Sequence, residues 1–118
     1  MNRAPARLRR ALAALAVVLP LAGSGPSLAD AMPTYTLLLK GGKVFPETLE
    51  VPANTRFRLE LRNEGPGAAE FESIELKKEK VLAPGVTSSL VFFPLKPGSY
   101  RFFDDFHPDT AQGRIVAK

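Results

Sequence analysis

The residues best suited to carry out chemistry lie near the carboxyl end of the chain, where its only histidine, His107, follows Asp104 and Asp105. Imidazole and carboxylate groups are common ligands of transition metals. The alternation of Tyr100 and Phe102 just before them predicts a strand with one buried face. If this strand continues, Asp104 and Asp105 point to opposite sides, so at most one of them joins His107. The pattern predicts a metal-binding loop, and the alternative is that these aspartates only accept hydrogen bonds from backbone N–H groups.

A second pair of carboxylates could complete such a site. Glu70 and Glu72 flank Phe71, so the two glutamates share one face of a strand if Phe71 is buried. They can converge on a cation, or they can form a solvated face. One imidazole with two or three carboxylates favours Cu(II), Fe(II), Fe(III) or Zn(II) over Cu(I), and binding should weaken in acid because the ligand imidazole must be neutral.

Short strand signals with turn residues between them recur along residues 32–118, and no long segment keeps a helical period. The clearest alternation is Arg56 to Arg62, with Phe57, Leu59 and Leu61 on the inner face. We interpret residues 77–80 as a solvated edge or connection. The pattern predicts an all-β, antiparallel Greek-key β-sandwich or barrel of about seven or eight strands. The expected strands or strand ends include residues 34–40, 48–51, 56–62, 70–75, 81–82, 86–93, 100–103 and 113–117.

The first thirty residues are typical of a helical secretory signal peptide. Four arginines form a basic start, residues 11–22 form an apolar stretch, and small residues follow at two positions that suit cleavage. We expect a signal peptide over residues 1–29 or 1–31 and one domain over residues 32–118. Arg9-Arg10 leaves open whether export follows the general or the twin-arginine route. The apolar stretch is too short to favour a membrane span, so the processed protein should not be embedded in the membrane.

Removal of this segment would change the charge. The chain has a formal net charge of +4, but four of its 16 basic residues lie in the expected signal peptide, so the remainder has a net charge of 0 or +1. A role in nucleic-acid binding therefore loses its support. The chain contains no cysteine, so the domain must be stable without disulfides. No nucleophile elbow, phosphate loop or zinc-protease motif is present, and we expect no enzymatic activity.

The chain from Phe45 onward resembles the cupredoxin-like family of small secreted β-sandwich proteins. The segments that carry the resemblance are residues 45–52, 57–63, 84–85, 97–102 and 113–116. Four further segments are similar to a subgroup of short periplasmic members that is associated with bacterial iron and copper uptake: residues 70–73, 84–85, 105–107 and 110–113.

This resemblance implies where a metal would bind. The family's blue-copper ligands are His, Cys, His and Met, and their positions here correspond to Ala69 or Glu70, to Asp104, to His107 and to Ala111. His107 alone keeps the family's ligand type. Without a thiolate, a blue-copper site is not expected. The resulting candidate metal ligands are His107, Glu70, Asp105, Asp104 and Glu72.

Two functions follow as expectations. The first is a periplasmic metal-binding protein that captures or delivers iron or copper for a membrane uptake component such as an iron permease. The second is a metal-free β-sandwich interaction domain that retains a vestigial site. The sequence leaves open which metal binds and whether the protein forms a homodimer.

Overall fold

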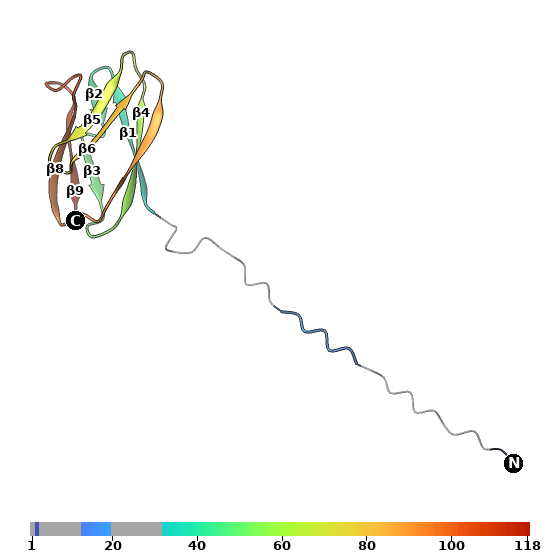
Figure 1. Cartoon of the computed structure of the whole chain (residues 1–118). Helices are drawn as coiled ribbons and strands as arrows, with labels where there is room; N and C mark the ends of the chain where they lie inside the picture. Colours follow the sequence, from blue (N-terminus) through green and yellow to red (C-terminus); the bar gives the residue numbers. More distant parts are fainter. Residues whose placement is uncertain (1, 3–12, 20–31) are drawn as a thin grey trace.

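The computed structural model describes residues 2, 13–19 and 32–118, and Figure 1 shows the last of these ranges folded into two layers of β-strands. Nine strands form within it, so the expected Greek-key β-sandwich is confirmed with slightly more strands than the seven or eight predicted. The strands are β1 (Thr34–Lys40), β2 (Lys43–Phe45), β3 (Thr48–Val51), β4 (Phe57–Asn63), β5 (Ala69–Ser73), β6 (Lys78–Leu82), β7 (Thr87–Phe92), β8 (Gly98–Asp104) and β9 (Gln112–Ala117).

The strands form a four-stranded sheet in the order β2-β1-β4-β7 and a five-stranded sheet in the order β3-β9-β8-β5-β6. The prediction of purely antiparallel pairing was wrong in two places, since β1 pairs with β4 and β3 pairs with β9 in parallel. Turn signals report only on strands that are neighbours in the sequence, whereas both parallel pairs join strands that are distant in the chain. The segment 77–80 interpreted as an edge belongs largely to β6, which is an edge strand.

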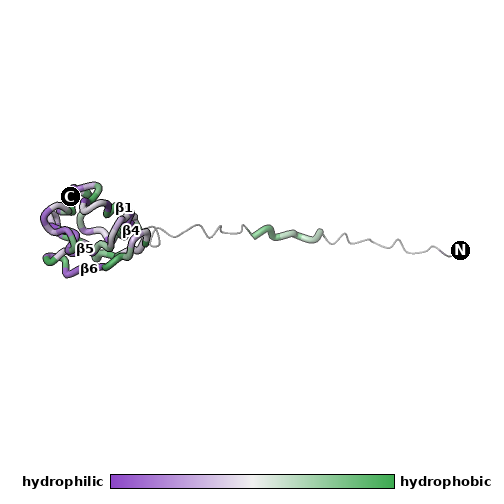
Figure 2. Tube along the Cα trace, turned by 90° about the horizontal axis from the view of Figure 1, so that it is seen from above, coloured by the Kyte–Doolittle hydropathy of each residue, from purple (hydrophilic) through white to green (hydrophobic). Residues whose placement is uncertain are grey.

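The core lies between the two sheets and is built from alternating strand residues. Phe57, Leu59 and Leu61 of β4 are fully buried, as predicted. Figure 2 shows hydrophilic and hydrophobic stretches alternating along the trace. Phe71 of the five-stranded sheet meets Phe92 of the four-stranded sheet edge to face, with ring centroids 6.4 Å apart. This contact joins the two layers through their aromatic side chains.

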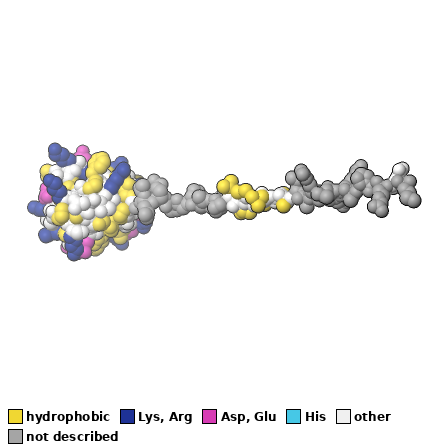
Figure 3. Space-filling view, turned by 90° about the horizontal axis from the view of Figure 1, so that it is seen from below, with side chains coloured by type: hydrophobic (Ala, Val, Ile, Leu, Met, Phe, Trp, Pro, Cys, Tyr) yellow, Lys and Arg dark blue, Asp and Glu magenta, His cyan; other side chains and the backbone are white. Residues whose placement is uncertain are grey.

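The expected signal peptide falls largely outside the described residues. Residues 13–19, which are described, form neither helix nor strand. In the described part of the chain, no helix has the length and apolar character that crossing a membrane requires. Figure 3 shows one end of the domain, where hydrophobic side chains lie between basic and acidic ones.

Candidate metal centre

His107 and Asp104 form a direct contact at the carboxyl end of β8. The Nδ1 atom of His107 lies 3.0 Å from Oδ2 of Asp104, and the two side chains are 43% and 3% exposed. The other carboxylate oxygen, Oδ1, accepts hydrogen bonds from the backbone N–H groups of Glu70 at 2.9 Å and Phe106 at 3.0 Å. Asp104 is therefore a buried carboxylate with three polar partners, which offset the cost of removing its charge from water.

The loop between β8 and β9 holds the imidazole in place. The backbone N–H of His107 donates to the carbonyl of Asp104, and the carbonyl of His107 accepts from the N–H of Ala111, both at 2.9 Å. Asp104 and Ala111 are also joined through the backbone at 2.9 Å. These short-range bonds close a compact loop and fix the direction of His107.

The turn between β1 and β2 covers one side of the imidazole. Thr110 donates its hydroxyl hydrogen to the carbonyl of Gly42 at 2.6 Å, which ties this turn to the β8–β9 loop. Gly42 has a φ of 72°, and a Cβ atom there would lie 3.0 Å from Cδ2 of His107. Glycine thus allows both the left-handed turn and the close approach to the ring.

A cavity of about 220 Å³ lies between these loops, and Ala69, Asp104 and His107 are among its lining residues. One of its walls is formed by residues 65–68, and the side chain of Asn63 holds this segment in place. The buried Asn63 side chain accepts from the N–H of Gly65 at 2.9 Å and donates to the carbonyls of Gly67 and Leu82 at 2.8 and 3.0 Å. Three of the positions that the family resemblance assigned to metal ligands therefore meet at one cavity.

The glutamates lie on the other face of the same sheet. Phe71 is paired with Asp104 and both are buried, whereas Glu72 is paired with Phe103 and points outward. Glu70, Glu72 and Glu79 place one carboxylate oxygen each within 4.8 Å of one another. This trio is the only group of three or more such potential ligands found among residues 2, 13–19 and 32–118.

Desolvation and repulsion by neighbouring carboxylates disfavour the charged forms of Glu70 and Glu72. Partial desolvation raises the pKa of Glu70 above its usual value, and Asp105, Glu72 and Glu79 raise it further. The pKa of Glu72 is raised by desolvation and then by Asp105 and Glu79. A cation placed among these carboxylates would relieve the repulsion.

The predicted ligands thus separate into two sets. Asp104 and His107 are in contact, while Glu70, Glu72 and the exposed Asp105 belong to the outer face. The Glu70 backbone still joins the sets, because its N–H binds the Asp104 side chain and its carbonyl accepts from the Asp105 N–H at 2.9 Å.

The sequence interpretation missed Glu79 as a neighbour of this outer group. Glu79 is paired directly with Glu72 in the β5–β6 hairpin. A hairpin centred on residues 74–77 would have predicted this pairing, because the two glutamates are equally distant from its turn. The sequence pattern indicates a solvated edge or connection at residues 77–80, which by itself names no partner for Glu79.

This geometry defines a class of protein, a two-layered β-sandwich with a cavity between the loops at one end. The family model described as cupredoxin-like domain matches residues 11–117. The chain therefore belongs to the cupredoxin-like family.

The comparisons also include an uncharacterized protein of Rickettsia prowazekii (strain Madrid E), RP394, which is 42% identical over 80 residues. This match covers 68% of the present chain, and the chain spans 64% of the length of that relative.

Solved structures share the fold at low sequence identity. Reduced auracyanin from Roseiflexus castenholzii is 13% identical with a TM-score of 0.62, and the match covers 75% of this chain and 98% of that one. Auracyanin B is 15% identical with a TM-score of 0.59, covering 73% and 88%. A chain of a heme-copper terminal oxidase dimer is 13% identical with a TM-score of 0.62, covering 77% and 68%.

Proposed function

We propose that this protein is a periplasmic metal-binding member of the cupredoxin-like family that captures or delivers copper or iron for a membrane uptake system. The observation that carries the proposal is the contact between His107 and Asp104 beside the cavity at the loop end of the sandwich. The proposal includes no catalytic step.

The separation of the two polar atoms suits a shared metal ion. Two ligand atoms that bind one ion through bonds of about 2.0–2.1 Å lie near 3.0 Å apart when the angle between the bonds is roughly 95°. Nδ1 of His107 and Oδ2 of Asp104 are 3.0 Å apart. A nitrogen and an oxygen at about a right angle match two neighbouring positions of a tetragonal Cu(II) ion. An ion with such bonds lies to one side of the line between the two atoms, so the imidazole would have to turn from its present contact with Oδ2 of Asp104 to direct its Nδ1 lone pair at the ion.

The donor set does not fit a blue-copper centre. The chain has no cysteine. The position of the family's first His corresponds to Ala69 or Glu70 and that of its Met to Ala111, so neither position keeps the family's ligand type. Blue copper depends on a thiolate ligand for its intense colour and tuned potential. We therefore propose transport of a metal ion by this chain, and not electron transfer through a blue-copper site.

Calorimetric titration of the purified protein with Cu(II), Zn(II) and Fe(II) tests the central claim. We expect saturable one-to-one binding that His107→Ala weakens at least about tenfold, which corresponds to loss of roughly 1.4 kcal/mol of binding free energy. Asp109→Asn, in the same loop, is the matched control and should bind like the parent protein. Binding weaker than roughly millimolar for every ion would reject the proposal.

The identity of the ion needs a second measurement, because Cu(II) binds most nitrogen and oxygen sites more tightly than other divalent ions. The electron paramagnetic resonance spectrum of the Cu(II) form should show coupling to one imidazole nitrogen, and His107→Ala should remove that coupling. Glu72→Gln should leave this spectrum unchanged if the Glu70, Glu72 and Glu79 trio is a separate site. A loss of imidazole coupling in Glu72→Gln would show that the two sets act as one.

Delivery to a membrane iron permease is tested in cells. Deletion of the gene should lower the accumulation of iron or copper under limitation, and the parent sequence should restore it while His107→Ala does not. Fractionation of the same cells should place the processed protein in the periplasm. Full restoration by His107→Ala would separate the cellular role from the metal site.

That last outcome would support the second candidate, a metal-free interaction domain. The Asp104 carboxylate accepts hydrogen bonds from two backbone N–H groups and contacts the His107 ring, so the protein itself supplies the partners that a purely structural role of this pair requires. In that case His107→Ala would leave both partner binding and the cellular phenotype unchanged.

A further inference from the structure

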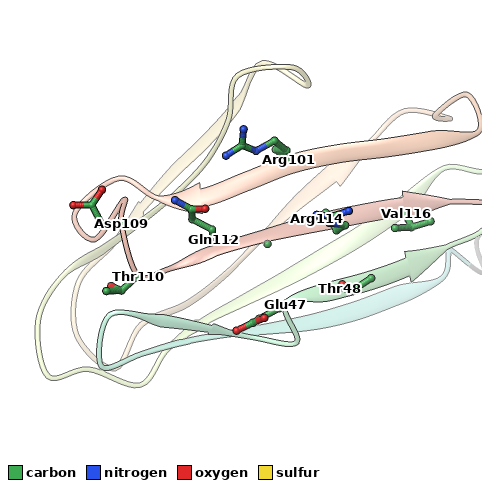
Figure 4. A pocket seen from close by; sticks show the side chains of 9 residues that line it. Glu47, Thr48, Arg101, Asp109, Thr110, Gln112, Arg114 and Val116 are labelled. Atoms are coloured by element: carbon green, nitrogen blue, oxygen red, sulfur yellow. The ribbon is translucent and has the colours of Figure 1, made fainter.

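A second hollow lies on the outer face of the five-stranded sheet and is distinct from the proposed metal centre. It has a volume of about 800 Å³ and extends over β3, β9 and β8 (Figure 4). Two arginines line it, Arg101 of β8 and Arg114 of β9, together with Gln112 and Thr48. Its lining residues do not include Asp104 or His107.

The two arginines are paired directly across neighbouring strands. Arg101 is in register with Arg114, and both side chains are exposed on the same face. Like charges directly opposite each other on a sheet disfavour folding. Within residues 2, 13–19 and 32–118, neither guanidinium group takes part in a salt bridge. The sheet thus presents two adjacent cations whose repulsion an anion would relieve.

We propose that this hollow is a binding site for a compact organic anion with two or more carboxylate groups. A guanidinium group is a planar fork of donors that binds a carboxylate through two parallel hydrogen bonds. Two such forks on paired strands suit two carboxylates of one small molecule. The inference goes beyond the proposed metal function and does not depend on it.

The surroundings of the arginines favour carboxylates over phosphate. Phosphate sites commonly use several free backbone N–H groups at a helix amino terminus or in a turn. Here the floor of the hollow is a sheet, and the β8–β9 ladder runs from Gly98 paired with Ala117 to Phe103 paired with Gln112. The side-chain forks are therefore the principal donors.

The acidic residues of the hollow restrict the size of its ligand. Asp109 lies at the loop end and Glu47 at the β3 side (Figure 4). Their carboxylates would repel an extended acidic segment that continued past the arginine pair. Gln112 donates its amide hydrogen to the carbonyl of Pro108 at 2.7 Å, which helps to fix the loop beside Arg114. A small molecule centred on the arginines avoids this repulsion.

Calorimetric titration of the metal-free, chelator-free protein with citrate, succinate, acetate and inorganic phosphate tests the site. We expect one-to-one binding of citrate or succinate, with acetate at least about tenfold weaker because it can engage only one fork. Arg101→Gln and Arg114→Gln should each weaken binding about 10- to 100-fold, the value of a charge-assisted pair. Both positions are exposed, so these variants should remain folded, which thermal unfolding verifies.

Arg58→Gln is the matched control, because Arg58 is an exposed strand residue of the opposite sheet. It should bind citrate like the parent protein, and so should His107→Ala, which separates this test from that of the metal site. Absence of saturable binding to both polycarboxylates would overturn the proposal. The proposal would also be overturned if Arg101→Gln and Arg114→Gln bound citrate as tightly as the parent protein does. Tighter binding of phosphate than of citrate would overturn it as well.

Discussion

Asp104 shows how one residue can serve both the fold and the candidate site. Its carboxylate is almost completely buried, yet each oxygen has a polar partner: the N–H groups of Glu70 and Phe106 on one side and His107 on the other. In the described part of the chain, no buried side-chain nitrogen or oxygen lacks a hydrogen-bond partner. Removing such a group leaves its buried donors unsatisfied.

We expect Asp104→Ala to lower the free energy of unfolding by about 2–3 kcal/mol, because two partly buried N–H groups lose their acceptor. Chemical denaturation measures this change. Asp105→Ala is the neighbouring control, and since Asp105 is exposed its effect should stay within about 0.5 kcal/mol. Equal losses in the two variants would contradict the structural role of Asp104.

The raised pKa values of Glu70 and Glu72 predict a pH dependence of stability. A carboxyl group with a raised pKa holds its proton longer in the folded protein than in the unfolded chain. The contribution of these two groups to the free energy of unfolding therefore falls as the pH rises from 4.5, their ordinary pKa, through their raised pKa values in the folded protein. The repulsion is fully present at neutral pH.

Glu72→Gln should accordingly raise the melting temperature at neutral pH and low salt. The increase should shrink at high salt, which screens exposed charges, and below pH 4.5, where the carboxylates take up protons. Thermal unfolding at several pH values and salt concentrations measures this. Glu50→Gln, which removes an exposed partner of Lys118, should give no increase. A melting temperature lowered by Glu72→Gln would show that the trio stabilises the fold.

At the scale of elements, β9 depends on a glycine. A Cβ atom at Gly113 would collide with the ring of Phe102 and would lie 2.6 Å from the backbone carbonyl oxygen of Glu47. The same carbonyl accepts a hydrogen bond from the N–H of Arg114 at 2.8 Å. The start of β9 can pack this closely between β8 and the segment before β3 only without a side chain.

Gly113→Ala should therefore destabilise the protein by about 1–3 kcal/mol, the usual cost of overpacking. Denaturation curves measure the loss. Gly67→Ala is the comparison, since nothing lies within 4 Å of a Cβ atom there, and it should cost much less. Because Gly113 also lines the hollow on the outer face, the Gly113 variant should weaken citrate binding if β9 shifts. If Gly113→Ala left the free energy of unfolding unchanged, β9 would be able to move enough to make room for the added methyl group.

Across the whole molecule, the two sheets are held by one aromatic cluster. The rings of Phe57 and Phe92 stack within the four-stranded sheet with centroids 4.8 Å apart, and those of Phe71 and Phe102 stack within the other at 5.3 Å. Phe71 and Phe92 connect the two stacks. All four side chains are fully buried, so each forms part of a single core.

We expect Phe71→Ala to cost about 3–5 kcal/mol, the usual range for truncating a buried phenylalanine. Denaturation followed by circular dichroism and by the fluorescence of a bound dye should give the same single transition. The reason is that the two sheets share one core, so they unfold together. Phe93→Ala, which truncates a phenylalanine that is 73% exposed, is the matched control. Separate transitions for the two sheets in the parent protein would contradict a single core.

Local pattern was sufficient to determine the class of fold. The alternation along residues 57–61 placed Phe57, Leu59 and Leu61 in the core, and Asn54 adopts the positive φ, 56°, for which its residue type is suited. The expectation that at most one of Asp104 and Asp105 joins His107 is also confirmed, although β8 ends at Asp104 and Asp105 is an exposed residue of the following turn. The buried face of a strand and the conformation of a turn residue depend on residues that are close in the sequence, so the sequence alone predicts them.

The arrangement of the candidate sites depended on pairing between distant segments. The sequence predicted that two or three of the candidate carboxylates join His107 in one site, but the register of β5 with β8 puts Asp104 on the inner face and Glu72 on the outer one. Register also brought Glu79 to Glu72 and Arg101 to Arg114. The amino-acid sequence by itself determined which residues could bind a metal and which face of each strand is buried. Only the tertiary structure decided which of these residues meet, because strand register follows from packing of the whole core and not from local spacing.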